Sequence, residues 1–374
     1  MRLDQVDIRL LRMPMVEPLA AAHGCESVRE ITVLRVDGGN DAGWGECAAL
    51  AGDTYSGETA AGAFALVRDV VGPELLASPL GGPSVDILAR VALTDPMVAA
   101  AVEMAVLDLE LRVAATSLSR HLGAVRERVT AGAAVGLDDE TEVIVERARS
   151  LAATGYRRIK VKIMPGHDVD IVDAVRAVLP AHVALQVDAN GSYDVADREH
   201  LRALDALDRR GLALIEQPLA AGELEALATL ARRLDTPICL DESLTSPDAV
   251  RRAVDLGACE VACLKPGRLG GVLVARAVHD DLRRRGVPTW IGGMIETGIG
   301  RAANLALAAL PGCTLPGDLS ATGRWFEHDL TASPVHIDAD GTLPVPRRPG
   351  LGVEIDVEAV ERFTVDRASL TSSS

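Results

Sequence analysis

The chain has 374 residues, more than one compact domain usually holds, so two structural units with a large core are expected. Apolar residues make up 48% of the chain but aromatic residues only 2%, so the core must be built from Ala, Leu, Val and Ile, which suits helices packed on buried parallel strands. The formal net charge of -16, with no local cluster of Lys and Arg, excludes a nucleic acid as the partner, and a small molecule is expected instead.

Cysteine usage and the first residues bear on the cellular compartment. The six cysteines are scattered and form no CxxC or Cys/His pattern, which favours reduced thiols in a core. The first residues, MRLDQVDIRLLRMP, carry charges throughout, unlike a signal peptide, and nowhere do about 18 uncharged apolar residues follow one another. The sequence therefore predicts a cytoplasmic protein with no membrane partner.

Residues 1–125 show the patterns of an α+β unit. The segments 6–13, 30–38 and 42–50 are typical of strands, and a Gly-Gly-Asn turn at 38–40, in which glycine adopts positive φ at little cost, joins the last two. An antiparallel meander is expected there. A long Ala/Met/Leu segment follows from about 94 to 112, and Thr-Asp-Pro at its beginning predicts the start of a helix.

After residue 129 the chain changes to a repeated unit, in which a short apolar run ends in a polar residue and an amphipathic helix follows. Such repeats predict alternating strands and helices. Eight runs fit a (β/α)8 TIM-type barrel of the α/β class over residues 126–322, with the active site at the C-terminal ends of the strands. Residues 323–374 lose the repeat and are expected to return to the first unit. The runs are 130–137, 157–163, 183–189, 212–218, 236–242, 261–267, 288–294 and 313–318.

Five charged residues close five successive runs. They follow one another at intervals of 24 to 28 positions, about one strand-helix unit each. In a barrel, residues at such intervals converge on one mouth from neighbouring strands. These residues are Lys162, Asp188, Glu216, Asp241 and Lys265.

The three carboxylates in this series predict a metal site, because their mutual repulsion in a partly dry site requires a cation. Oxygen ligands with room for water and substrate favour Mg²⁺ or Mn²⁺ over Zn²⁺. A single carboxylate at a strand end is more often a helix cap or a solvated residue, and Asp241 in particular could cap a helix. Three in register favour the metal, so Asp188, Glu216 and Asp241 are the predicted ligands.

Lysine is unusual at the inner end of a buried strand, because a buried ammonium must be paired or neutralised. Lys160 and Lys162 alternate with Val161, so both point to one face, which is inward because apolar residues occupy the other. The alternative is a solvated Lys-Val-Lys edge. Lys265 is expected roughly across the mouth from Lys162, so that a substrate would lie between two ammonium groups.

The chemistry predicted for this arrangement is removal of a proton next to a carboxylate. Repulsion between the lysines, the metal and partial desolvation, with Arg268 acting in the same direction, are expected to lower the lysine pKa values, so that a neutral amine serves as base near neutral pH. Loss of the proton places negative charge on the oxygens of an enediolate. A divalent ion, aided by Lys160, would stabilise that charge.

Several motifs follow one another in a specific order: RMPMVEPL, GWGEC, KVK, VDANGSY, IEQPL, CLDES, LKPGRLGG and GGMIETGIGRAANLALAALPG followed by PGDLS. With them the chain resembles the enolase superfamily, in its muconate-lactonising-enzyme-like subgroup, over nearly its whole length. Within that subgroup it is most similar to o-succinylbenzoate synthases that double as N-acylamino acid (N-succinylamino acid) racemases.

The resemblance implies an N-terminal capping domain whose loops near 16–26 and 48–58 close over the barrel and choose the substrate. It implies that Lys162 and Lys265 form the acid/base pair, that the three carboxylates hold Mg²⁺ and that Lys160 contacts the substrate carboxylate. In a synthase, which serves menaquinone biosynthesis, Lys162 would take the proton and assist departure of water, while Lys265 stabilises the enediolate as a cation. In a racemase, both lysines exchange protons on opposite faces. Homo-oligomers are implied as well.

Further residues are expected around this core of the site. The resemblance implies supporting roles for Asn190 and Glu242. The glycines before Met294 are expected to let backbone N–H groups, including that of Gly293, approach the far end of the substrate, although a tight strand-to-helix turn is an equal alternative. Tyr55 is either a lid contact or a surface residue. The lid segment 49–56 is less apolar and aromatic than relatives would lead us to expect, which leaves the exact substrate open.

Other functions are left open. Dipeptide epimerases resemble one another in an Asp-x-Asp on the last strand that holds the substrate ammonium, whereas this chain reads GDLS at 317–320 and lacks the second aspartate. Muconate cycloisomerase is compatible with the catalytic residues, although GGMIETGIG favours the synthase/racemase branch. A Schiff-base aldolase using Lys265 or Lys162 would not require three aligned carboxylates. A non-catalytic barrel is the remaining alternative.

Overall fold

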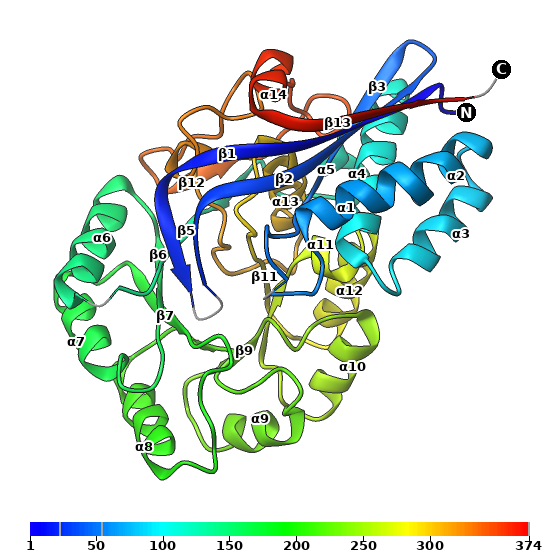
Figure 1. The fold of residues 1–374 in the computed structure, drawn as a ribbon. Coiled ribbons are helices and arrows are strands. Elements are labelled where there is room, and N and C mark those ends of the chain that lie inside the picture. The colour runs from blue at the N-terminus through cyan, green and yellow to red at the C-terminus, as the bar shows by residue number, and fades with distance from the viewer. Residues whose placement is uncertain (22–23, 54, 139, 373–374) are drawn as a thin grey trace.

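The computed structural model of the protein describes residues 1–21, 24–53, 55–138 and 140–372. Its N-terminal part contains a four-stranded antiparallel sheet with the strand order β13-β1-β2-β3, which lies across the top of the molecule in Figure 1. The predicted meander is confirmed, and Gly39 in the β2–β3 turn has a φ of +66°. The strands are β1 (Gln5–Ala21), β2 (Gly24–Gly38), β3 (Asp41–Cys47) and β13 (Thr364–Thr371).

Strands β1 and β2 are longer than the sequence patterns predicted. Their pairing shifts register between Pro14 and Leu19 and then continues to Ala21, so both strands extend over the barrel (Figure 1). Residues 14–18 are exposed or only half-buried, so this extension has no core face and no alternation that a pattern could reveal. Residues 22 and 23 of the first predicted lid loop and residue 54 of the second lie outside the described residues.

The sheet packs on helix α4 (Pro96–Val113), which confirms the predicted long helix and begins with the expected proline. Glycines in β3 allow this close approach, since a Cβ atom at Gly45 would lie 2.0 Å from the carbonyl oxygen of Ala101. The remaining helices of this part are α1 (Ala60–Leu66), the π-helical turn η1 (Val67–Val71), α2 (Gly72–Ala77), α3 (Gly82–Val91) and α5 (Leu118–Leu122).

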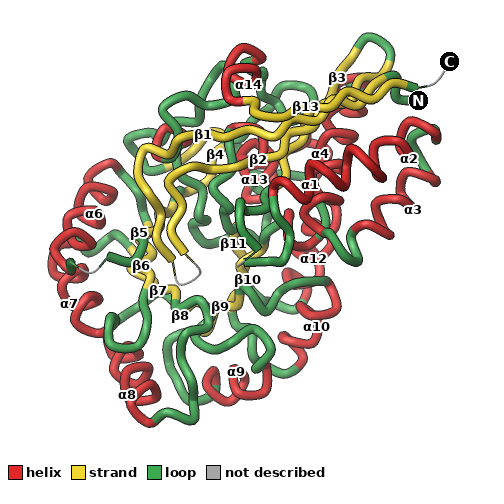
Figure 2. Tube along the Cα trace, viewed as in Figure 1, coloured by secondary structure: helices red, strands yellow, loops and turns green. Residues whose placement is uncertain are grey.

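The second part is a curled parallel sheet with the strand order β11-β10-β9-β8-β7-β6-β5, surrounded by helices (Figure 2). The order follows the chain, as the predicted barrel requires. Seven of the eight predicted runs form its strands. They are β5 (Gly132–Val135), β6 (Arg158–Lys162), β7 (Ala184–Asp188), β8 (Ile215–Glu216), β9 (Ile238–Leu240), β10 (Val261–Leu264) and β11 (Thr289–Ile291).

The eighth run closes the ring without forming a regular strand. On one side the N–H of Asp318 donates to the carbonyl of Ile291 at the end of β11. On the other side the N–H of Gly132 in β5 donates to the carbonyl of Gly317. The eighth position of the barrel is therefore occupied by an extended segment, in which Pro316 and Gly317 interrupt a continuous ladder.

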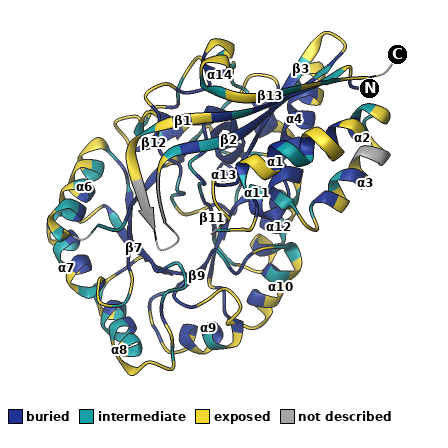
Figure 3. Cartoon of the chain, in the orientation of Figure 1, coloured by how far each residue is buried: buried dark blue, intermediate teal, exposed yellow. Residues whose placement is uncertain are grey.

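The outer helices cover the parallel strands, and their outward faces are exposed while the strands between them are buried (Figure 3). Amphipathic patterns with a polar outer face explain this arrangement. These helices are α6 (Thr141–Thr154), α7 (Val169–Val178), α8 (Arg198–Leu207), the 3-10 turn η2 (Asp208–Arg210), α9 (Leu224–Ala231), α10 (Pro247–Asp255) and α12 (Val272–Arg284). Two further helices, α11 (Pro266–Leu269) and α13 (Gly298–Ala308), also follow barrel strands but are buried almost throughout.

The C-terminal segment has two destinations. Strand β12 (Thr342–Pro344) pairs with β4 (Arg128–Thr130), which directly precedes the barrel, so this piece does not join the N-terminal sheet. After α14 (Val357–Phe363), strand β13 pairs with β1 and brings the two ends of the chain together (Figure 1).

Two further findings bear on the sequence expectations. Within the part of the chain that the structure describes, no helix is long and apolar enough to cross a membrane. Five cysteines have described side chains and all of them are buried free thiols, whereas the side chain of Cys25 lies outside the described part.

Candidate active site

A cavity of about 730 Å³, partly open to solvent, lies at the C-terminal ends of the barrel strands. Leu50 and Tyr55 of the second lid loop form part of its wall. Six of the residues singled out in the sequence line the cavity, and the other five contact lining residues from behind. The six are Lys160, Lys162, Asn190, Lys265, Gly293 and Met294, and the five are Asp188, Glu216, Asp241, Glu242 and Arg268.

Strand β6 presents two lysines to the cavity. Lys160 and Lys162 line it, while Val161 between them is fully buried on the other face, which confirms the predicted alternation. Nζ of Lys162 donates to Oδ2 of Asp188 at 2.7 Å and to Oδ1 of Asn190 at 2.8 Å. The alternative of a solvated Lys-Val-Lys edge is therefore wrong.

Lys160 lies at the centre of a buried group of carboxylates. Its Nζ is 3.1 Å from Oδ2 of Asp188, 3.0 Å from Oε2 of Glu216 and 2.5 Å from Oδ2 of Asp318. Arg158, also buried, contacts the other oxygen of Asp318 at 2.5 Å. The ammonium of Lys160 therefore bridges two of the three predicted metal ligands.

Lys265 approaches the cavity from the end of β10, and strands β7, β8 and β9 separate it from β6 in the ring. Its Nζ lies 2.8 Å from Oδ2 of Asp241 and 2.8 Å from the hydroxyl oxygen of Tyr55. Arg268 contacts the same two partners, at 2.7 Å from Oδ1 of Asp241 and 2.6 Å from the Tyr55 hydroxyl. Tyr55 is thus a lid contact to the site and not a surface residue.

Two lysines of the site have shifted pKa values. Burial disfavours the charged form of Lys265, but its electrostatic interactions, of which that with Asp241 is the largest, together outweigh burial and raise the pKa well above its ordinary value. Burial likewise opposes the charge on Lys160, and Asp318, Glu216 and Asp188 outweigh it, so its pKa is also raised. The lowering that the sequence predicts applies to Lys162 and Lys265 beside a bound metal, and it stays a prediction; in this structure the ammonium group of Lys265 contacts the carboxylate of Asp241 directly.

The pKa values of the three carboxyl groups shift in different directions. Burial, together with the charge of Asp188, raises the pKa of Glu216 well above its ordinary value. Burial also acts on Asp188 and Asp241, but their cationic neighbours outweigh it and lower both pKa values.

The donor set fits a divalent cation. Oxygen atoms of Glu216 and Asp241 and the sulfur of Cys263 lie within 4.8 Å of one another, all of them buried. Oδ1 of Asp241 accepts no hydrogen bond, although it lies 2.7 Å from Arg268. Asp188 is not part of this compact group. Burial raises the pKa of the Cys263 thiol well above its ordinary value, so the oxygens and not the sulfur are the donors suited to Mg²⁺.

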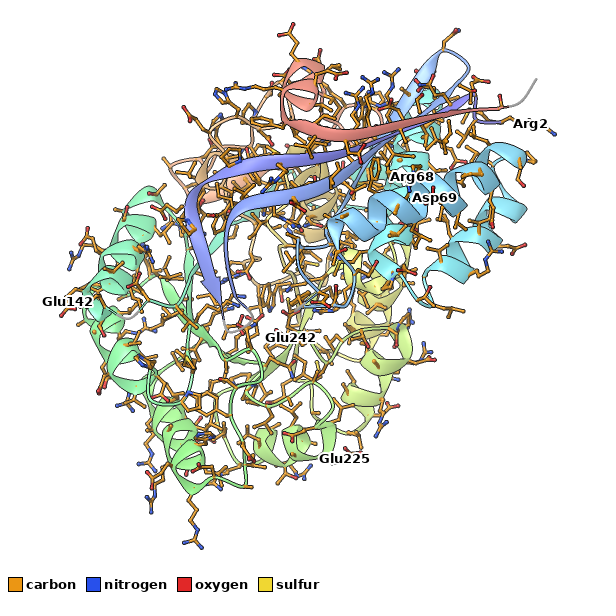
Figure 4. All side chains as sticks on the ribbon, viewed as in Figure 1. Arg2, Arg68, Asp69, Glu142, Glu225 and Glu242 are labelled. Atoms are coloured by element: carbon orange, nitrogen blue, oxygen red, sulfur yellow. The ribbon has the colours of Figure 1, made fainter. Side chains whose placement is uncertain are left out.

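Asn190 and Glu242 are connected to Lys162 by a chain of hydrogen bonds. The Asn190 side chain accepts from Lys162 and donates through Nδ2 to Oε1 of Glu242 at 2.8 Å. Asn190 has a φ of 45°, a conformation that asparagine tolerates better than most residues. In Figure 4, Glu242 lies toward the interior of the ring, whereas Glu142 and Glu225 lie at its periphery.

The Gly-Gly-Met segment after β11 contributes to the wall, but most of its backbone donors are occupied. The N–H of Gly292 donates to the carbonyl of Leu264, and that of Met294 to Oε1 of Glu296 at 2.8 Å. The buried Arg29 of β2 donates to the carbonyls of Met294 and Ala49, which joins this segment to the lid loop. These two N–H groups are therefore not free to bind a substrate.

Sequence reasoning missed several residues of the site. Asp318 closes the eighth run, so the rule that selected the other five strand-end residues also applies to it. Arg301, Ser320, Arg324 and Trp325 line the cavity from segments with no strand pattern. Arg301 and Ser320 fall within motifs quoted from the sequence, but no local pattern places their side chains, or those of Arg324 and Trp325, at the cavity.

Comparison with known proteins agrees with this geometry. Residues 143–360 match the family described as Enolase C-terminal domain-like. The chain is 44% identical over 373 residues to an N-succinylamino acid racemase of Amycolatopsis sp, with 100% of both chains covered. It is 38% identical over 365 residues to an o-succinylbenzoate synthase of Geobacillus kaustophilus, covering 97% of this chain and 96% of the relative.

A solved structure gives the same result for the three-dimensional fold. The enolase superfamily member from Listeria innocua Clip11262 superimposes with a TM-score of 0.91 at 30% sequence identity, over 100% of both chains. The matched family covers the strands that bring the lysines and carboxylates together, and the full-length relatives extend the match to the N-terminal sheet. The protein is therefore an enzyme of the enolase superfamily.

Proposed function

We propose that this enzyme removes the proton α to a substrate carboxylate, acting as an o-succinylbenzoate synthase of menaquinone biosynthesis with N-succinylamino acid racemase activity. The observation that carries the proposal is the placement of Lys162 and Lys265 in one cavity, on strands separated by three others around the ring. Two amines on opposite walls can reach opposite faces of one carbon. The names of the two relatives above support this choice of substrate.

In dehydration, Lys162 as a neutral amine takes the α-proton and then returns it to the departing hydroxyl, which leaves as water. Lys265 remains a cation in this reaction and stabilises the charge of the enediolate. In racemisation, one lysine removes the proton and the other delivers its own proton to the opposite face. Asn190 accepts a hydrogen bond from Lys162 and thereby orients its Nζ.

We propose that Asp188, Glu216 and Asp241 hold Mg²⁺, or Mn²⁺ in its place. The ion would supply positive charge to the substrate carboxylate and so favour the enediolate. Lys160, which contacts Asp188 and Glu216, would contact the substrate carboxylate beside the ion.

The alternatives have specific distinguishing features. An epimerase of dipeptides would need an acidic group for the substrate ammonium, but position 320 is a serine in the cavity wall. A Schiff-base aldolase would need a lysine amine but no group of carboxylates, whereas Asp188 and Asp241 lie beside Lys162 and Lys265 here. A muconate cycloisomerase would use the same two lysines, so only its different substrate distinguishes this alternative from the proposed function.

The test is α-proton exchange in D₂O. The purified enzyme with Mg²⁺ is incubated with an N-succinyl amino acid and followed by NMR and polarimetry, beside an absorbance assay for o-succinylbenzoate formation. We expect deuterium at the α-carbon with loss of optical rotation, and dehydration in the second assay. Lys162→Ala and Lys265→Ala should each lower racemisation by a factor of about 100 or more.

The outcomes separate the branches. Dehydration without racemisation would assign the synthase alone, and metal binding without either reaction would refute the choice of substrate. Imine trapping by borohydride with a carbonyl substrate, independent of Mg²⁺, would favour the aldolase. We further propose a cytoplasmic homo-oligomer, which light scattering of the purified protein and fractionation of cells would test.

A further inference from the structure

The charges that line the active-site cavity are unbalanced. Asp318 is the acidic residue among the described lining residues, whereas five lining residues are cationic. Four of the five are paired with buried carboxylates: Lys160 with Asp318, Lys162 with Asp188, Lys265 with Asp241 and Arg301 with Glu296. The fifth, Arg324, forms no ion pair with any carboxylate in the described part of the chain.

Arg324 is held in place by contacts that are not ion pairs, while Asp318 and Glu17 act on its charge from farther away. It ends the 3-10 turn η3 (Thr322–Arg324), and its guanidinium carbon lies 4.4 Å from the centroid of the Trp325 ring. Its Nη2 donates to the carbonyl oxygen of Ala134 in β5. Burial lowers its pKa, yet a guanidinium remains charged at any physiological pH. A stacked guanidinium with further N–H donors is well suited to a carboxylate.

The position of Arg324 is opposite the predicted metal ligands. It contacts β5, which adjoins the eighth position of the ring, whereas Glu216 and Asp241 follow β8 and β9 on the far side of the strand order. Arg324 also lines a neighbouring groove together with Glu17 and Pro18 of β1, so it lies at the boundary of the cavity. A substrate whose reacting carboxylate lies beside Glu216 and Asp241 would extend toward Arg324.

We propose that Arg324 binds a second anionic group of the substrate, the distal carboxylate of a succinyl-type acid, and thereby sets a preference for dicarboxylic over monocarboxylic substrates. This inference rests on the proposed function for the identity of the substrate. The N–H groups of Gly292 and Met294 in the Gly-Gly-Met segment are occupied within the protein, so these two groups do not provide this contact.

The experiment compares an N-succinyl amino acid with its terminal amide, which has the same shape but no distal charge. Binding is measured by calorimetry and α-proton exchange by NMR, for wild type, Arg324→Met and Arg324→Lys. We expect wild type to favour the carboxylate over the amide by about tenfold to a hundredfold, the range for a hydrogen bond to a charged group. In Arg324→Met this preference should be lost because the KM for the carboxylate rises while the KM for the amide stays unchanged. Arg324→Lys should recover part of the preference.

The control is Arg147→Met, because Arg147 lines the neighbouring groove but not the cavity and is paired with Asp138 at 3.1 Å. It should leave the preference for the carboxylate unchanged. Equal losses on carboxylate and amide in Arg324→Met, or no preference in wild type, would overturn the proposal. Binding that prefers the carboxylate and depends on Arg324, without any proton exchange, would refute the proposed reaction and retain the role of Arg324.

Discussion

Tyr55 illustrates how one residue of the lid reaches the reaction centre. Its hydroxyl oxygen accepts hydrogen bonds from Lys265 at 2.8 Å and from Arg268 at 2.6 Å, and its ring lies 4.8 Å from Nζ of Lys265. Burial, which Arg268 only partly offsets, raises the pKa of Tyr55 to about 12, so the phenol stays protonated near neutral pH. Its role is therefore to orient the lysine and not to act as the base.

Replacing this hydroxyl should affect the two directions of racemisation unequally. In Tyr55→Phe, Lys265 loses one hydrogen-bond partner and Lys162 loses none, so we expect exchange of the enantiomer deprotonated by Lys265 to fall about tenfold, the effect of roughly 1.4 kcal/mol. The rates of deuterium uptake from each pure enantiomer measure this. Equal losses for both enantiomers would contradict an orienting role at Lys265.

Asp318 neutralises two cations that have little access to water. Arg158 is 1% exposed and Lys160 is 4% exposed, and both contact this one carboxylate at 2.5 Å. Their charges outweigh the effect of burial and lower the pKa of Asp318. Because its removal leaves the buried charge of Arg158 without a carboxylate, Asp318→Asn should reduce the free energy of unfolding by about 3–5 kcal/mol.

Denaturant unfolding at neutral pH measures this loss. The matched control is Asp338→Asn, which removes a carboxylate that pairs with Arg128 at the surface. Exposed ion pairs contribute about 0–1 kcal/mol, so the control should unfold almost as wild type does. Similar losses in both variants would show that Asp318 is no more important than a surface ion pair.

At the scale of elements, buried carboxylates fasten the N-terminal part to the barrel. Glu46 of β3 accepts hydrogen bonds from the N–H of Thr297 at 2.9 Å, its hydroxyl at 2.6 Å and the N–H of Gly300 at 2.8 Å, all at the N-terminus of α13. Glu103 of α4 similarly accepts from the first N–H groups of α12. Helix N-termini favour such carboxylates, because their N–H groups lack partners within the helix.

The pKa of Glu46 predicts how this contact depends on pH. Burial raises it from 4.5 to about 7. At pH values between these two, the folded protein retains a proton that the unfolded chain has released. The contribution of Glu46 to stability therefore falls as the pH rises from about 4.5 to 7, and it stays constant above pH 7. The difference amounts to about 3 kcal/mol at 1.36 kcal/mol per pKa unit.

Glu46→Gln imitates the protonated side chain and tests this dependence. Relative to wild type, the variant should be similarly stable at pH 5 and more stable by about 3 kcal/mol at pH 8, as measured by denaturant unfolding at both pH values. Glu142→Gln, at an exposed position on α6, should show no such change. A difference between Glu46→Gln and wild type that is the same at both pH values would contradict the raised pKa.

For the whole molecule, the metal site couples binding to stability. A cation that binds the folded carboxylates but not the unfolded chain stabilises the fold by about 2.7 kcal/mol at a hundredfold excess over Kd. Excess chelator should therefore abolish activity, and Mg²⁺ or Mn²⁺ should restore it and raise the melting temperature. Asp241→Asn should reduce that rise in temperature. Full activity in chelator would contradict a metal requirement.

The whole molecule also brings together segments that are remote in the sequence. The cavity combines the lid loop before α1, the strand ends of the barrel and the turn η3 after the barrel closes. Strand β13 completes the N-terminal sheet from the other end of the chain. The active site is therefore a product of both structural parts and could not be assembled by the barrel strands alone.

The sequence by itself determined the barrel, the meander and the five strand-end residues, because a period of two along each strand and one polar residue per strand-helix unit are local properties. The inward direction of Lys160 and Lys162 followed from the same alternation. Only the tertiary structure decided the irregular eighth strand, the contact of Tyr55 with Lys265, the raised lysine pKa values and the unpaired charge of Arg324. These depend on distances of 2.5 to 3.1 Å between segments far apart in the chain, which no local pattern encodes.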